Sequence, residues 1–256
     1  MIDKEVVRSR FARAWGSYDR EAHFQRQMAE ELTALYPGHG SRETVLELGC
    51  GTGLFSLMLR DAVPAGSRFT FNDLSPEVFP YLEEKVGTGH TLLPGDAETI
   101  DWGGPYSLIA SNASIQWWKE PLGFFRKASK CLSDGGRILL GTFLPDNFFE
   151  LNSVTGCALR YPSPEGLRKA LGEAGFSEIR LTKLREVYSF PGIHEMLRHI
   201  KYTGTNGLVT DTKGIWTPAR LRELEEEFRR MNGLSASESL PLTYSALLLS
   251  AHKEPL

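Results

Sequence analysis

Three glycines spaced by single residues follow a short apolar run in the stretch from Val45 to Gly53. Glycine permits positive φ and has no Cβ to block a ligand lying against the backbone. A dinucleotide fingerprint would read G-x-G-x-x-G and hold a pyrophosphate. Here the pattern is G-x-G-x-G, preceded by Glu47. A carboxylate beside the turn favours a cationic ligand over a phosphate; the alternative is a glycine turn in another kind of α/β protein.

Acidic residues also follow the next two apolar runs. Asp73 ends the second run, and we expect it to accept hydrogen bonds from both hydroxyls of a ribose, as in dinucleotide folds. Asp96 and Ala97 follow the third run, where Asp96 could accept from the exocyclic amine of an adenine and Ala97 could offer its backbone N–H. The alternatives are a turn carboxylate for Asp73 and a common Gly-Asp turn for residues 95–96.

The segment Ser111–Trp118 leaves the end of the fourth predicted strand and carries polar and aromatic residues. Side chains at the carboxyl ends of strands in an α/β sheet face the bound ligand. Asn112, Gln116 and Trp117 are therefore predicted to line a reaction pocket. The alternative for Trp117 and Trp118 is that they are packed aromatics.

About fifty residues, 191–240, separate the sixth and seventh predicted strands, and connections this long are uncommon without a function. They contain helical patterns at 192–202 and 218–231. Arg198 and Lys201 lie one turn apart in the first, which suggests a lid over the acceptor pocket. The alternative, a solvated basic face, is the commoner fate of such residues.

The elements that must position these residues alternate between apolar strand runs and amphipathic helices. A helical segment at 4–35 comes first, and Gly16 predicts a break near Gly16-Ser17 because glycine destabilises a helix interior. Ser75 is predicted to cap the helix after the second strand. The predicted strands lie at 44–48, 67–72, 91–93, 106–110, 137–143, 179–190 and 242–251.

Composition excludes several classes of function. The 256 residues carry a net charge of −3, so no global basic field indicates nucleic-acid binding. No run of about 18 apolar residues predicts a membrane span, and the charged start is no signal peptide. Three widely spaced cysteines fit a reducing cytoplasm. His194 and His199 are five apart, off the spacing of a helical metal site, so no metal is expected.

The glycine stretch resembles the first motif of class I S-adenosylmethionine-dependent methyltransferases, whose ligand carries an ammonium and a sulfonium. Over about residues 4–252 the chain is similar to one family of these enzymes, the malonyl-acyl-carrier-protein O-methyltransferases of biotin synthesis. The matching residues are Phe11, Tyr18, Ala22, Gln25, Ser111, Asn112, Gln116, Trp117, Lys201, Gly204 and Pro241–Tyr244. Trp15, Gly16 and Asn72 depart from the expected pattern.

The resemblance implies an α/β, Rossmann-like fold with a seven-stranded, mostly parallel sheet whose last strand is antiparallel. It implies a helical N-terminal cover at 1–40, a core at 41–190 and 241–256, and a helical lid insertion at 191–240. The implied S-adenosylmethionine-binding residues are Glu47, Gly49, Cys50, Gly51, Gly53, Asp73, Leu74, Asp96, Ala97, Asn112 and Ala113. The implied acceptor-side residues are Tyr18, Gln116, Trp117, Arg198 and Lys201.

The implied reaction moves a methyl group from S-adenosylmethionine to the free carboxylate of malonyl-acyl carrier protein, which gives the ester primer for pimelate and biotin. A carboxyl with an ordinary pKa near 4 is already a nucleophile at neutral pH, which agrees with the absence of a defensible catalytic dyad in the sequence. Docking an acidic carrier predicts a local basic patch, with candidates Arg8, Arg10, Arg13, Arg220, Arg222, Arg229 and Arg230. The alternatives are a methyltransferase for a small carboxylic acid or other small molecule, and a non-catalytic S-adenosylmethionine-binding protein.

Overall fold

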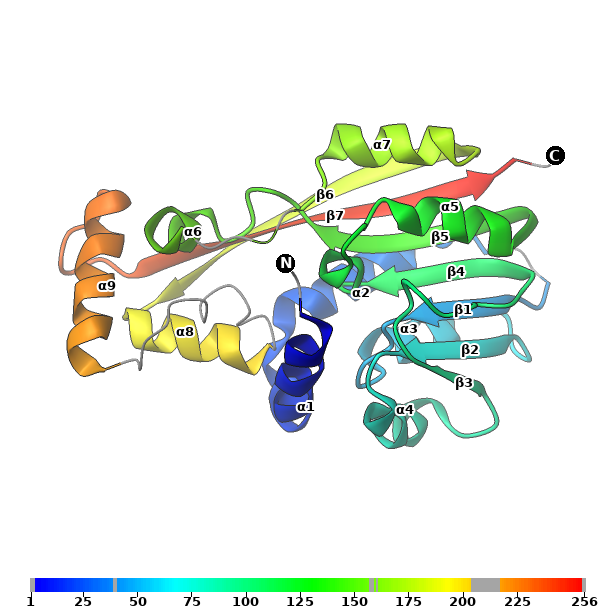
Figure 1. Ribbon diagram of the computed structural model, residues 1–256, viewed down its shortest axis with the longest axis horizontal. Helices are drawn as coiled ribbons and strands as arrows, with labels where there is room; N and C mark the ends of the chain where they lie inside the picture. Colours follow the sequence, from blue (N-terminus) through cyan, green and yellow to red (C-terminus); the bar gives the residue numbers. More distant parts are fainter. Residues whose placement is uncertain (1–2, 39–40, 157–158, 160, 204–216, 255–256) are drawn as a thin grey trace.

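The computed structural model describes residues 3–38, 41–156, 159, 161–203 and 217–254 (Figure 1). The strands are β1 (Thr44–Leu48), β2 (Arg68–Asp73), β3 (Thr91–Pro94), β4 (Tyr106–Asn112), β5 (Leu132–Phe143), β6 (Phe176–Phe190) and β7 (Leu240–Lys253). The helices are α1 (Lys4–Glu21), α2 (His23–Ala34), α3 (Leu54–Ala62), α4 (Phe79–Val86), α5 (Gly123–Cys131), α6 (Phe149–Thr155), α7 (Pro164–Glu173), α8 (Ile193–Tyr202) and α9 (Pro218–Met231), with 3-10 turns η1 (Pro76–Val78) and η2 (Ile115–Trp117).

The strands form one sheet in the order β3-β2-β1-β4-β5-β7-β6. The first five strands pair in parallel, and β7 runs antiparallel to both β5 and β6. This confirms the predicted mostly parallel sheet with an antiparallel last strand. Glu47 near the end of β1 is in register with Phe71 of β2 and Ala110 of β4. The ends of β1, β2 and β4 therefore meet at one edge of the sheet, where ligands bind in such folds.

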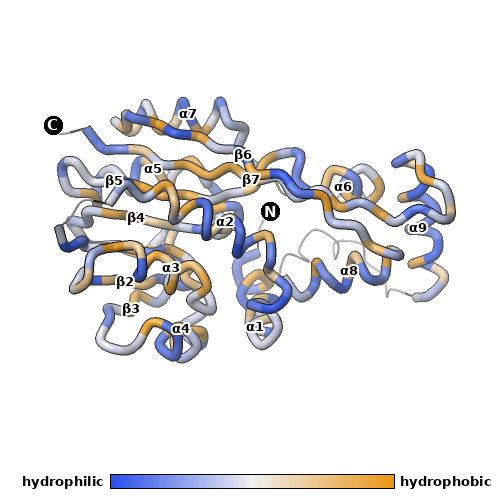
Figure 2. Tube along the Cα trace, turned by 180° about the vertical axis from the view of Figure 1, so that it is seen from behind, coloured by the Kyte–Doolittle hydropathy of each residue, from blue (hydrophilic) through white to orange (hydrophobic). Residues whose placement is uncertain are grey.

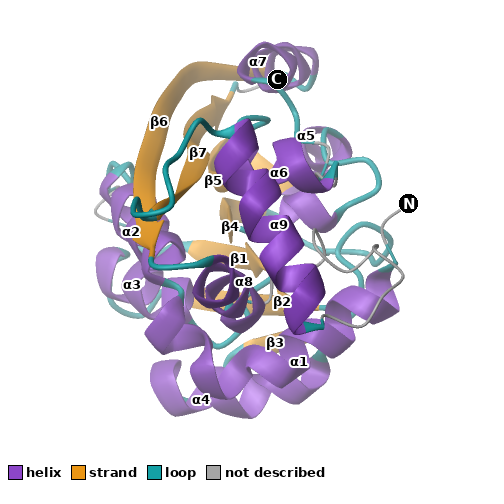
Figure 3. Cartoon of the chain, turned by 90° about the vertical axis from the view of Figure 1, so that its left-hand side faces the viewer, coloured by secondary structure: helices purple, strands orange, loops and turns teal. Residues whose placement is uncertain are grey.

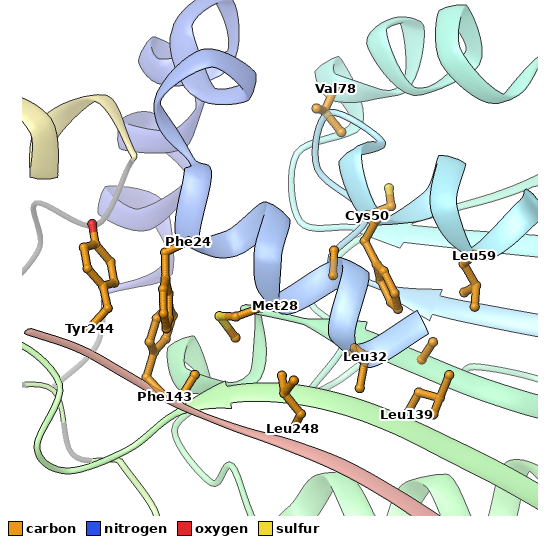
Figure 4. Packing of buried hydrophobic residues seen from close by; sticks show 14 of the residues in the cluster. Phe24, Met28, Leu32, Cys50, Leu59, Val78, Leu139, Phe143, Tyr244 and Leu248 are labelled. Atoms are coloured by element: carbon orange, nitrogen blue, oxygen red, sulfur yellow. The ribbon is translucent and has the colours of Figure 1, made fainter. Parts of the chain in front are cut away.

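Buried apolar side chains fill both faces of the sheet, and Figure 2 shows the apolar colouring concentrated on its strands. On one face α2 lies flat against the sheet. Figure 4 shows Phe24, Met28 and Leu32 of α2 above Leu139 and Leu248 of β5 and β7. This packing makes α2 part of the core, although it precedes the first strand in the sequence.

The N-terminal helices break at Ala22, and the predicted break near Gly16-Ser17 is wrong. Helix α1 runs straight through Gly16, where an added Cβ would meet no atom within 4 Å. Ala22 has φ −82° and ψ 49° and is fully buried. The break lies here because α2 must turn Phe24 and the residues after it into the core, and this tertiary packing outweighs the local cost of a glycine.

Ser75 occupies the predicted N-cap position, followed by Pro76, but at a 3-10 turn and without a side-chain cap bond. The chain forms the 3-10 turn η1 before α4, and the Ser75 side chain caps neither. The Ser75 backbone N–H instead donates to Asp73 Oδ1 at 2.8 Å. A carboxylate two residues upstream is the stronger acceptor and forms the turn itself.

Two helices of the predicted lid, α8 and α9, lie beyond the end of the parallel strands (Figure 1), and both face the viewer in the end-on view of Figure 3; α9 packs on α6 and α8. Helix α8 packs on α1, α9, β6 and β7. The rest of the predicted lid, residues 204–216, lies outside the described residues. Among the described helices, none combines the length and the apolar character that a membrane crossing requires.

Candidate active site

A cavity opens where the ends of β1, β2 and β4 face helix α1. Of the predicted S-adenosylmethionine-binding residues, all but Gly53 line it: Glu47, Gly49, Cys50, Gly51, Asp73, Leu74, Asp96, Ala97, Asn112 and Ala113. Gly53 instead begins α3 in the left-handed region, at φ 82°, close against Leu82 of α4. The structure thus brings together residues that lie more than sixty positions apart in the chain.

The glycine turn is held by backbone donors that point at β2. The N–H groups of Gly49 and Cys50 both donate to the Asn72 carbonyl at 2.9 Å. Gly49 adopts φ 70°, and a Cβ at this position would collide with the Ser114 side chain. Glycine is therefore required at position 49 by conformation and by space.

Asp73 links the glycine turn to the loop after β2. Its Oδ2 accepts from Gly51 N–H at 2.9 Å, and its Oδ1 accepts from Ser75 N–H at 2.8 Å. Burial raises the pKa of Asp73, and its backbone donors oppose that shift. Each carboxylate oxygen has two lone pairs, so the fixed carboxylate can still accept from hydroxyl groups of a ligand.

Three buried oxygen atoms of cavity-lining residues have no hydrogen-bond donor among the described residues: Gln25 Oε1, Glu47 Oε2 and Asn112 Oδ1. A buried acceptor left without a partner costs about 1–3 kcal/mol. Glu47 is 1% exposed. Burial raises its pKa to about 8; the nearby Ser56 hydroxyl opposes this shift, and the Asp73 carboxylate adds a smaller increase. This set of acceptors therefore fits a ligand that brings positive charge and N–H donors, as S-adenosylmethionine does with its sulfonium and its ammonium.

An ionic contact beside the cavity joins the N-terminal helix to the segment after β3. Lys4 Nζ of α1 lies 3.1 Å from Asp96 Oδ1 and 3.1 Å from Glu98 Oε2. Arg8 pairs with Glu77, and Asp19 pairs with Lys85. Helix α1 is thus attached to segments on several sides of the cavity through polar groups that water and salt can reach.

The segment after β4 presents its backbone and Trp117 to the cavity. Ala113 has φ 51°, and its N–H donates to the Gly141 carbonyl at 2.9 Å. Gln116 is buried and lies outside the cavity lining; its Nε2 donates to the Ala113 carbonyl at 2.6 Å. Trp117 lines the cavity, and its buried Nε1 meets no acceptor among the described residues.

Aromatic side chains of α1 form the wall opposite the sheet. Phe11 meets Trp117 edge-on at 5.8 Å between ring centroids and lies 6.3 Å from Tyr18. Burial, aided by the Asp19 and Asp73 carboxylates, raises the pKa of Tyr18 above its ordinary value. Tyr18 therefore stays protonated at neutral pH and can act as a hydrogen-bond donor.

Arg198 and Lys201 lie outside the cavity lining, on the exposed side of α8. The buried side of this helix carries Ile193, Met196 and Ile200. The apolar spacing i, i+3, i+7 in the sequence already separates these two faces. A role for Arg198 and Lys201 in binding the acceptor stays a prediction.

Sequence reasoning predicted a cover from the N-terminal helices and a role for Tyr18, but it missed most of the α1 and α2 residues that line the cavity. The cavity is also lined by Lys4, Val7, Arg8, Phe11 and Trp15, and by Gln25. The α1 residues follow helical spacing together with Tyr18, so the periodicity could have indicated one continuous face. Their partner could not be found this way, because it lies across the fold. Within the described residues, no group of three His, Cys, Asp or Glu could hold a metal ion.

Comparison with known proteins agrees with this geometry. The family model described as "Methyltransferase domain" matches residues 18–181. The malonyl-[acyl-carrier protein] O-methyltransferase of Porphyromonas gingivalis is 32% identical over 252 residues, which cover 98% of this chain and 96% of the relative.

Solved structures show the same fold. A candidate methyltransferase from Bacillus halodurans aligns with a TM-score of 0.65 and 17% identity, covering 89% of this chain and 99% of that one. Phosphoethanolamine N-methyltransferase 2 of Haemonchus contortus, solved with S-adenosyl-L-methionine, aligns with a TM-score of 0.54 and 16% identity over 90% of this chain and 52% of that one. The fold, the buried acceptors of the cavity and the near-full-length similarity together establish that this chain belongs to the malonyl-[acyl-carrier protein] O-methyltransferase family of S-adenosylmethionine-dependent methyltransferases.

Proposed function

We propose that this protein transfers a methyl group from S-adenosylmethionine to the free carboxylate of a malonyl group carried by acyl carrier protein. The observation that carries the proposal is the cavity itself. It combines buried acceptors for a cationic ligand with an aromatic wall supplied by α1. The product ester would hide the carboxylate charge and serve as a primer for pimelate and biotin synthesis. We place the reaction in the cytoplasm, where free thiols such as Cys50 and Cys131 persist.

Different residues of the cavity would bind the three parts of S-adenosylmethionine. Glu47 and the turn at Gly49 suit its amino-acid part, Asp73 suits the ribose hydroxyls, and Asp96 with Ala97 suits the adenine. When bound there, S-adenosylmethionine supplies an electrophilic methyl group. The chain contributes binding, orientation and the exclusion of water.

The acceptor needs alignment more than activation. A malonyl carboxyl is ionised at neutral pH, so no general base is required. Tyr18, whose raised pKa keeps it protonated, and Trp117 both line the cavity and offer an O–H and an N–H donor. Neutral donors can orient the carboxylate with less loss of nucleophilicity than a buried cation. Such positioning can contribute about 7–11 kcal/mol to a barrier reduction.

Arg198 and Lys201 are proposed to contact the acceptor as it approaches along α8, since α8 packs against the cover helix α1. Arg198→Ala and Lys201→Ala should lower turnover while the affinity for S-adenosylmethionine stays unchanged. Lys130, an exposed lysine on α5, provides the matched control as Lys130→Ala. Full activity in both α8 variants would remove these residues from the proposal.

The basic surface for an acidic carrier is proposed to lie on α1. The α9 candidates are largely occupied by neighbours on their own helix: Arg220 pairs with Glu223, Arg229 with Glu225 and Arg230 with Glu227. Arg13 of α1 is exposed. Added salt should slow the reaction of malonyl-carrier protein and leave that of a small malonyl thioester unchanged, because only the carrier presents an acidic surface.

A mass-spectrometric assay tests the proposal. Malonyl-carrier protein, malonyl-coenzyme A and free malonate are incubated in parallel with the protein and S-adenosylmethionine. Faster methylation of the carrier-bound malonyl group is expected. Methylation of free malonate alone would favour a small-acid methyltransferase. Measurable S-adenosylmethionine binding with no methylation of any acceptor would favour a non-catalytic binding protein.

A further inference from the structure

The loop at residues 95–102, which we call the adenine-side loop, carries two cavity-lining residues, Asp96 and Ala97. It follows β3 and contains only turns, so no helix or strand fixes its shape. Whatever orients its polar groups toward the cavity must therefore come from contacts made by the loop with its surroundings.

Lys127 of α5 supplies three of these contacts, all of them to backbone carbonyls of the loop. Its Nζ donates to the carbonyl of Ala97 at 2.9 Å, to that of Glu98 at 3.4 Å, and to that of Ile100. The same ammonium lies 4.8 Å from the centre of the Trp102 ring. Three carbonyls of the loop thus converge on one partly buried cation, and hydrogen bonds to a charged donor are stronger than neutral ones.

Trp102 provides a second side-chain donor to the adenine-side loop. Its side chain is almost fully buried, and its Nε1 donates to the Ala97 carbonyl at 2.8 Å. The Ala97 carbonyl therefore accepts from both Lys127 and Trp102. Two donors on one oxygen fix the direction of the peptide that follows Ala97.

The preceding peptide is fixed by the turn itself. The Asp96 carbonyl accepts from Thr99 N–H at 2.9 Å and Ile100 N–H at 3.0 Å. A trans peptide is planar with its C=O and N–H pointing opposite ways, so the Ala97 N–H points away from the turn. Within the described residues it has no acceptor, although Ala97 is only 7% exposed. A purine with an amine beside a ring nitrogen would complement this N–H and the Asp96 carboxylate.

We propose that Lys127 is a positioning residue for adenine recognition: it shapes the adenine-side loop so that Ala97 and Asp96 read the amino-substituted edge of the base. The inference rests on the proposed use of S-adenosylmethionine. It concerns binding alone, so its test needs no methyl acceptor.

The test compares two ligands in Lys127→Met, with Lys130→Met as the control. Dissociation constants are measured for S-adenosylhomocysteine and for S-inosylhomocysteine, in which an oxygen replaces the 6-amino group. The wild-type protein and Lys130→Met should prefer the adenosyl ligand. In Lys127→Met this ligand should bind about tenfold more weakly, the inosyl ligand should change little, and the preference should collapse. Equal weakening of both ligands, or an unchanged preference, would overturn the proposal.

Trp102→Phe keeps the proposal testable should Lys127→Met fail to fold. It keeps an aromatic side chain at this buried position and removes the indole N–H that donates to Ala97, together with part of the ring volume. The preference for the adenosyl ligand should fall in this variant, by less than in Lys127→Met. An unchanged preference would count against the proposal. Absence of methyl transfer to every acceptor would instead count against the proposed function and leave this binding comparison intact.

Discussion

Glu47 makes the affinity for S-adenosylmethionine depend on pH. Its carboxyl is buried, Oε2 has no donor among the described residues, and its pKa is raised to about 8. Below about pH 8 the ligand-free protein therefore holds Glu47 mostly protonated. A cationic ligand favours the ionised carboxylate, so binding must release a proton, and affinity must rise with pH.

The size of the effect follows from linkage. Release of one proton changes the binding constant by a factor of about 10 for each pH unit. Between about pH 5.5 and 7.5 the affinity should therefore rise by up to about 100-fold. Above about pH 8 the contribution of Glu47 should level off. The raised pKa of Glu47 affects folding in the opposite direction. In the unfolded chain this carboxyl ionises near pH 4.3, so the stability of the ligand-free fold decreases as the pH rises from about 4.3 toward 8.

Isothermal titration calorimetry in two buffers with different ionisation enthalpies measures both the affinity and the number of protons released. We expect close to one proton per ligand at about pH 6.5. Glu47→Gln is nearly isosteric and cannot ionise, so its affinity should be lower at about pH 7.5 and its profile flatter. An equally steep profile in Glu47→Gln, or none in the wild-type protein, would refute this reasoning.

Three further predictions concern the turn, the cover and the core. Gly49→Ala should lower S-adenosylmethionine affinity about tenfold or more, because it combines φ 70° with a collision at Ser114; Gly16→Ala, where nothing lies within 4 Å, should bind normally. Lys4→Met should speed dissociation of S-adenosylmethionine about two- to fivefold in stopped flow, since it removes the pairs to Asp96 and Glu98; an unchanged rate would mean that α1 does not retain the ligand. Phe24→Ala should cost about 3–5 kcal/mol in urea unfolding, because the ring is 1% exposed; a loss under 1 kcal/mol would contradict its place in the core.

The sequence best predicted those cavity-lining residues that directly follow a strand. Glu47, the glycine turn and Asp73 lie at the ends of two clearly apolar strands, so the order of elements already places them at one sheet edge. The same reasoning placed Asp96 and Asn112 at the cavity. Parallel strands with short connections leave little freedom in where such residues lie.

Tertiary packing decided what the sequence could not. The helix break falls at Ala22 because α2 must bury Phe24. Locally, Gly16 is the stronger signal for a break, so the sequence alone pointed to the wrong position. Lys4 reaches Asp96 across 92 positions of the chain. Lys127 likewise reads as an ordinary helix lysine until the fold brings the carbonyls of the adenine-side loop around it.

The most direct test of the central claim asks where the methyl group goes. The protein is incubated with S-adenosylmethionine and either malonyl-carrier protein or acetyl-carrier protein, which lacks the free carboxylate. Tandem mass spectrometry then locates any added methyl group. The account predicts one methyl on the terminal carboxylate of the malonyl group and none on the acetyl carrier. Methylation of both carriers at another position, or of neither, would contradict it.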